Sequence, residues 1–122
     1  MSRVSSIKKS QKESLLRREI STLFQQICID NPTLLGLSIS RVSLSDDKGL
    51  CSVFFYSPEG QSLFDRKLDI LKLFKRSLRK AIAQKVVARY VPELIFKYDT
   101  QLEKQLSIEQ LLDQVKETDH IS

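Results

Sequence analysis

The stretch "LFKRSLRKAIAQKVVARYVPELIF", Leu73 to Phe96, passes from a strongly basic helical pattern directly into a pattern typical of a β-strand. From residue 63 to about residue 86, apolar side chains recur at steps of three and four: Phe64, Leu68, Leu71, Phe74, Leu78 and Ile82. This period predicts a helix with one apolar stripe. Two residues depart from this pattern: the apolar Leu73 projects away from the stripe, and the charged Lys85 projects toward it. A helix that bends or restarts would explain both.

The end of the stretch predicts the last strand of a sheet. Leu94, Phe96 and Tyr98 alternate with other residues, as expected for a strand with one buried face. Pro92 lacks a backbone N–H and therefore belongs at the beginning of a strand, where no ladder bond is lost. We expect this strand to begin at or just before Pro92.

The preceding residues predict a helix and a β-hairpin. Residues 14–29 carry apolar side chains at helical spacing, and Pro32 and Gly36 then interrupt the chain. Residues 37–45 and 50–56 are expected to be antiparallel strands joined by the turn at 46–49. The alternation in 37–45 changes phase, which indicates a β-bulge or a strand partly buried on both faces.

The predicted order is α-β-β-α(α)-β, an α+β domain with helices on one face of a three-stranded mixed sheet. A chain of 122 residues allows one such domain, which we assign to residues 1–99, with residues 1–10 as a potentially flexible start. Residues 100–122 are expected to form an acidic tail. In it, residues 100–105 would be a loop, residues 106–112 at most a short helix, and the chain beyond Val115 disordered or weakly packed.

Charge is distributed unevenly between these two parts. Residues 1–98 contain 18 basic and 9 acidic side chains, whereas residues 99–122 contain 2 and 6, which gives +9 against −4. A basic body suggests a polyanionic partner, and the acidic tail should stay away from the surface that binds it.

Candidate catalytic and cofactor-binding groups are scarce. His120 is the only histidine and lies near the C-terminus, so no Ser-His or Cys-His pair can form. The three glycines are far apart, which excludes a glycine-rich phosphate loop. Cys28 and Cys51 lie in apolar segments and are expected to be buried, reduced thiols of a cytoplasmic protein. Neither a secretory signal nor a transmembrane run is present, and we expect no catalysis, no cofactor and no metal.

A second, basic stripe runs roughly 130° around the long helix from the apolar one. A solvated helix face is the usual explanation for such charges. Here the like charges at i,i+4 would each cost roughly 0.2–0.5 kcal/mol, and Asp69 is the only acidic residue between residues 66 and 91. A membrane-surface role is less suitable, because the apolar stripe is needed to cover the sheet. We therefore predict phosphate contacts from a monomeric RNA-binding domain, made by Lys72, Lys75, Arg76, Arg79, Lys80, Lys85 and Arg89.

The chain also resembles ribosome-binding factor A. The resemblance extends from about Arg17 to Leu112 and is most specific in "RYVPEL" (89–94), followed by Phe96 and Asp99. It implies a type II KH-like fold, binding to the small (30S) ribosomal subunit and its 16S rRNA during late maturation, and no catalysis. The family's Ala-x-Gly kink falls at residues 74–76, where this chain has Phe-Lys-Arg. Our hypothesis is that Arg76 substitutes charge for the close backbone approach that a glycine allows.

One alternative function remains open from the sequence, a protein-interaction module that docks an acidic protein partner through the basic helix. Aromatic side chains do not decide between the two. Phe54, Tyr56, Tyr90 and Tyr98 could stack on bases, but at strand spacing they more often belong to a core or to a sheet surface.

Overall fold

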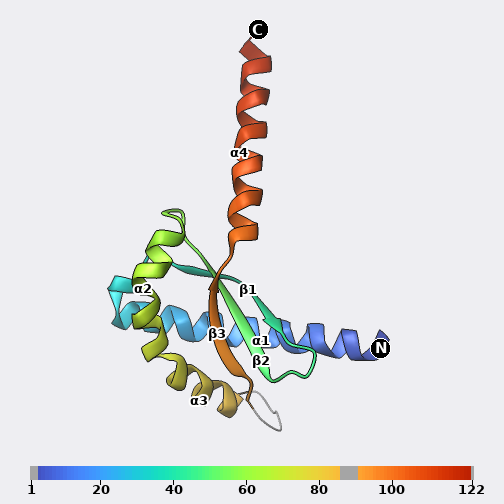
Figure 1. Ribbon diagram of the computed structural model, residues 1–122, viewed down its shortest axis with the longest axis vertical. Helices are drawn as coiled ribbons and strands as arrows, with labels where there is room; N and C mark the ends of the chain where they lie inside the picture. The colour runs from blue at the N-terminus through green and yellow to red at the C-terminus, as the bar shows by residue number, and fades with distance from the viewer. Residues whose placement is uncertain (1–2, 86–90, 122) are drawn as a thin grey trace.

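The computed structural model describes the backbone of residues 3–85 and 91–121, and the side chains of residues 8–85 and 91–115. Its elements follow the predicted order (Figure 1): α1 (Arg3–Asp30), the 3-10 turn η1 (Pro32–Leu34), β1 (Ser38–Leu44), β2 (Leu50–Tyr56), α2 (Gln61–Leu73), α3 (Lys75–Lys85), β3 (Glu93–Tyr98) and α4 (Thr100–Ile121). The predicted α+β class is confirmed, and a fourth helix is added at the C-terminus.

The sheet has the strand order β1-β2-β3 and is mixed, as predicted. β1 pairs antiparallel with β2, whereas β3 pairs parallel with β2 after the helical crossover. The register between β1 and β2 shifts between Ile39 and Arg41, which confirms the predicted bulge. This shift turns Val42 and Leu44 into the core and leaves Arg41 on the other face.

The core lies between one face of the sheet and the helices α1, α2 and α3. Phe55 of β2 stands at its centre, with ring centroids 5.3 Å from Phe24, 5.8 Å from Phe64 and 5.5 Å from Phe96. In Figure 1, α1 crosses behind the strands, while α2 and α3 follow one another around the side of the sheet. The opposite face of the sheet therefore stays open.

The first helix begins much earlier than residue 14. α1 starts at Arg3, because residues 3–30 contain neither glycine nor proline and nothing interrupts the helix. Its N-terminal half is tied to the hairpin by an ion pair of 3.3 Å between Lys9 Nζ and Asp46, and by the N–H of Leu44, which donates to Glu13 Oε2.

The last strand begins one residue later than expected, at Glu93 rather than at or just before Pro92. Glu93 donates its N–H to the carbonyl of Gly49 at 2.9 Å, and Pro92 has no N–H to donate. The predicted end of the long helix near Val86 lies outside the described residues.

The predicted loop at residues 100–105 and the short helix after it are wrong. α4 begins at Thr100 and continues to Ile121, past Val115, after which we expected the chain to be disordered or weakly packed. The reason lies in Asp99, whose Oδ1 accepts the N–H of Leu102 at 3.0 Å and so acts as an N-cap. The following residues are mostly good helix formers and include no glycine or proline.

Both cysteines are free and buried. Burial raises the pKa of both thiols, and for Cys51 burial together with the nearby charge of Glu13 raises it to about 12. A thiol held so firmly protonated is a core side chain rather than a nucleophile. In the part of the chain that the structure describes, no helix is long and apolar enough to cross a membrane.

Candidate nucleic-acid interface

The apolar stripe of α2 and α3 fixes which side chains point outward. Phe64, Leu71, Leu78 and Ile82 are buried against the sheet and α1, and Leu68 and Phe74 pack against the same core. The predicted stripe is thus confirmed. Leu73 is 77% exposed, as its departure from the stripe suggested.

The expected interruption of the long helix occurs at Phe74. Phe74 stays in the right-handed helical region, with φ −91° and ψ −3°, and its N–H donates to the carbonyl of Leu71 at 3.1 Å. Its own carbonyl accepts the N–H of Leu78 at 2.9 Å, which opens α3. The chain therefore breaks at the position of the family's kink without a glycine, since no positive φ is required there.

Three of the predicted cations form an exposed line. Lys72, Arg76 and Lys80 follow one another at intervals of four residues, and all three are exposed. Among the side chains that the structure describes, no acidic group lies within ion-pair distance of them. Lys72 lies in the last turn of α2, and Arg76 and Lys80 lie on α3, so the exposed line runs from one side of the break at Phe74 to the other.

Arg79 has a different environment. Its Nε donates to the carbonyl of Pro92 at 3.2 Å, and its Nη2 donates to the carbonyl of Val91 at 3.3 Å. The guanidinium thus ties α3 to the residues that lead into β3. Sequence reasoning could not have found these acceptors, because they lie 12 and 13 residues away along the chain.

Lys75 and Lys85 also have partners. Lys75 is half-buried, and its Nζ lies 5.4 Å from the ring centroid of Phe96. Lys85 Nζ lies 3.5 Å from Glu19 Oε2 on α1. Arg89, the seventh predicted contact, lies outside the described residues. The structure therefore assigns the most available charge to Lys72, Arg76 and Lys80.

Two further basic side chains were missing from the sequence-based set. Arg41 on β1 and Lys97 on β3 are exposed on the open face of the sheet, on either side of Phe54. Of the four aromatic candidates, Phe54 and Tyr56 are half-buried, whereas Tyr98 is buried and donates its hydroxyl to the carbonyl of Ser57. Tyr90 is among the residues that are not described.

The acidic helix leaves the body far from α3. Figure 1 shows α4 extending from the end of the sheet opposite the end at which α3 lies. The negative charges of α4 therefore do not neutralise the line formed by Lys72, Arg76 and Lys80.

Residues 8–112 match the family model of ribosome-binding factor A. The chain belongs to the ribosome-binding factor A family. A relative from Prochlorococcus marinus subsp. pastoris is 36% identical over 109 residues, which cover 88% of this chain and 82% of that protein. A relative from Desulfitobacterium hafniense is 33% identical over 102 residues, which cover 84% of this chain and 81% of that protein. The resemblance seen in the sequence is thereby confirmed.

Solved structures of ribosome-binding factor A have the same fold. The crystal structure from Thermus thermophilus superimposes with a TM-score of 0.63 at 28% identity, covering 74% of this chain and 93% of that one. The solution structure of a protein from Thermotoga maritima, described as a putative ribosome-binding factor A, superimposes with a TM-score of 0.65 at 26% sequence identity. The match covers 73% of this chain and 84% of that one. The KH-like α+β architecture follows from these matches.

A third structural match concerns a complex. It is a homology model of the T. thermophilus ribosome-binding factor A, fitted into a cryo-electron microscopy map of a 30S–RbfA complex. Its TM-score is 0.56 at 28% identity, and the match covers 71% of this chain and 91% of that one.

Proposed function

We propose that this protein binds the small (30S) ribosomal subunit through its 16S rRNA during late maturation of the subunit, and that it leaves before translation. It acts in the cytoplasm as a monomer and catalyses no reaction. Family membership and the 30S–RbfA complex among the structural matches support this proposal.

The observation that carries the proposal is the exposed line of Lys72, Arg76 and Lys80. Arg76 and Lys80 are like charges at i,i+4 within α3, and such a pair destabilises a helix by roughly 0.2–0.5 kcal/mol. Contact with rRNA phosphates would offset this cost, because each contact releases counterions from the nucleic acid. The buried stripe of α2 and α3 holds the line rigid, so that several weak contacts add without a further loss of side-chain order.

A binding role also agrees with the chemistry of the remaining groups. The two thiols are buried with raised pKa values, and the single histidine, His120, is the third residue from the C-terminal end of the sequence. Binding to RNA needs neither a nucleophile nor a cofactor, and we assign none.

Co-sedimentation with purified 30S subunits tests the proposal. Charge reversal of the line, with Lys72, Arg76 and Lys80 all changed to Glu, should abolish co-sedimentation while the melting temperature stays near that of the wild type. The matched control reverses three exposed cations elsewhere, Lys8, Arg17 and Arg66, and alters the net charge equally. The control should still bind, because contacts rather than net charge hold the protein on the subunit.

Two results would contradict the proposal. If the charge-reversed variant binds 30S subunits as the wild type does, these three residues do not contact the subunit. Loss of subunit binding with undiminished binding to naked 16S rRNA would instead favour the alternative function, in which the line docks an acidic protein.

A further inference from the structure

The open face of the sheet carries one row of side chains that crosses all three strands. Arg41 of β1 is the direct partner of Phe54 in β2, and Phe54 is the direct partner of Lys97 in β3. Adjacent strands are about 4.8 Å apart, so the row extends roughly 10 Å across the sheet. An aromatic ring thus stands between two cations on a surface that no described helix covers.

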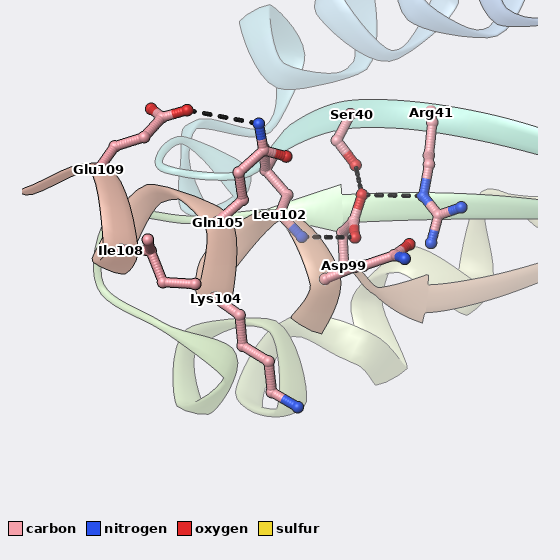
Figure 2. Close-up of a pocket in the computed structure, with 9 residues that line it drawn as sticks. Ser40, Arg41, Asp99, Leu102, Lys104, Gln105, Ile108 and Glu109 are labelled. Carbon is pink, nitrogen blue, oxygen red and sulfur yellow. Dashed lines mark hydrogen bonds and ion pairs between the residues drawn. The ribbon is translucent and has the colours of Figure 1, made fainter. Parts of the chain in front are cut away.

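Arg41 is fixed in place over the ring of Phe54. Its Cζ lies 3.9 Å from the ring centroid, which is a stacking distance for a guanidinium. Its Nε donates to Oδ2 of Asp99 at 3.1 Å (Figure 2), and the Asp99 side chain is only 3% exposed. The Arg41 side chain itself is 46% exposed, so the guanidinium is held from one side and available from the other.

A cavity of about 630 Å³ adjoins this row, between β1 and the first turns of α4. Figure 2 shows Arg41 and Asp99 at one side of the cavity and Lys104, Gln105 and Ile108 at the other. Lys104 supplies a further cation and Gln101 an amide at its lining. Lys97 Nζ lies 5.9 Å from the Phe54 centroid and extends the positive charge to β3.

The acidic groups on this side of the molecule leave those cations in excess. Asp99 offsets the charge of Arg41 and also accepts the hydroxyl of Ser40. The hydrogen bond that Glu109 accepts from the neutral amide of Gln105 does not cancel a carboxylate charge, so the three cations exceed these two carboxylates by one charge. Glu93 lies at the other end of β3. Arg41, Lys97 and Lys104 can therefore face an anionic ligand.

We propose that this row is a second RNA-binding surface, which takes a single-stranded segment of one or two nucleotides. A base stacks on the Arg41 guanidinium, with the Phe54 ring as its support, and Lys97 and Lys104 contact the adjoining phosphates. Bases that are unpaired stack on aromatic rings and on guanidinium planes, whereas bases inside a duplex are not available. This inference rests on the proposed function, since it adds a surface to the same RNA-binding role.

Fluorescence anisotropy with a labelled 12-nucleotide single-stranded RNA and with a 12-base-pair RNA duplex tests the proposal. Phe54→Leu keeps an apolar side chain in place but removes the ring, and should weaken single-strand binding about tenfold with little effect on duplex binding. For the single strand, Lys97→Ala should lower the slope of the logarithm of the association constant K against the logarithm of the salt concentration by about 0.7. The matched control is Lys48→Ala in the β1–β2 turn, away from the row, which should leave both measurements unchanged.

The outcomes separate this inference from the proposed function. Single-strand binding that is unchanged in both Phe54→Leu and Lys97→Ala overturns the inference, whatever the 30S result. Loss of 30S co-sedimentation in Phe54→Leu with unchanged binding of the single strand overturns it too, because the face would then contact protein. If Phe54→Leu loses the single strand while the charge-reversed line still binds 30S, the sheet surface stands and the role proposed for α2 and α3 fails. If Phe54→Leu has a lower melting temperature than the wild type, the salt slope of single-strand binding in Lys97→Ala is the measurement that decides.

Discussion

Asp99 and Arg41, 58 residues apart in the sequence, form an ion pair of 3.1 Å at the junction of the sheet and α4. The same carboxylate accepts the hydroxyl of Ser40 at 2.7 Å and caps α4 through the N–H of Leu102. One buried side chain therefore joins the bulge of β1, the end of β3 and the start of α4. The bulge at Ser40 is what brings two consecutive residues of β1 within reach of it.

Asp99 should contribute stability that depends on pH. Burial alone would raise its pKa, but the hydrogen bonds from Ser40, Leu102 and Arg41 and the charge of Arg41 outweigh burial, and the pKa is lowered. A carboxyl with a lowered folded-state pKa stabilises the fold above its unfolded value of about 3.9. That stability is lost as the pH falls through the folded-state pKa.

Urea unfolding from about pH 6 to pH 2 should therefore show a smaller loss of stability in Asp99→Asn than in the wild type. Asp99→Ala should lower the free energy of unfolding near neutral pH by roughly 2–4 kcal/mol, since it also removes the cap and leaves Arg41 without its partner. Asp65→Asn serves as a control, because Asp65 is exposed and forms no ion pair among the described residues. Equal pH dependence in Asp99→Asn and the wild type would refute this role.

Arg79 should be a stabilising residue as well as a basic one. Arg79→Ala removes both hydrogen bonds to the carbonyls of Val91 and Pro92 and should lower stability by about 1 kcal/mol, or roughly 5 °C in melting temperature. Lys80→Ala, one residue along the same helix, should change the free energy of unfolding by less than about 0.5 kcal/mol. Identical melting temperatures for the two variants would show that the guanidinium contributes nothing to the joint.

Arg76 tests whether charge replaces the missing family glycine. If it does, Arg76→Gly should retain much of the affinity for RNA, because close backbone approach becomes available again. Arg76→Ala offers neither charge nor close backbone approach, and its affinity for 16S rRNA should fall about tenfold at low salt. Binding curves on 16S rRNA at one salt concentration compare the two. Equal losses in both variants would reject the substitution hypothesis.

The distal half of α4 should be dispensable for folding. Leu111, Leu112 and Val115 are all more than half exposed, so they bury little against the body. Truncation after Asp113 should change the melting temperature by less than about 5 °C, which corresponds to roughly 1 kcal/mol for a domain of this size. It should also leave 30S binding nearly unchanged. A larger drop in either measurement would assign α4 a structural or binding role.

The sequence was informative wherever a segment buries its apolar side chains against the sheet. The stripe from Phe64 to Ile82 has a period that only a helix satisfies, and even its misfit at Leu73 indicated the break that occurs at Phe74. α4 lacks such a signal because it extends away from the body and buries little. Its start depends on the cap at Asp99, a residue that the sequence alone places equally well at the end of a strand.

The candidate site was predictable in part for the same reason. The apolar stripe determines that Lys72, Arg76 and Lys80 face outward. The carbonyl acceptors of Arg79 and the pairing of Lys85 with Glu19 depend on contacts between distant segments, which periodicity does not contain. Likewise, Arg41 and Lys97 meet at Phe54 only through the strand register, which the bulge shifts by one residue.

The salt dependence of binding to naked 16S rRNA tests most directly whether Lys72, Arg76 and Lys80 contact phosphates. Each phosphate contact adds about 0.9 to the slope of log K against log salt for duplex nucleic acid. Changing all three residues to Gln should therefore flatten the slope by about 3 and lower the affinity most at low salt. A variant whose slope runs parallel to that of the wild type would contradict the account, because these side chains would then face solvent in the complex.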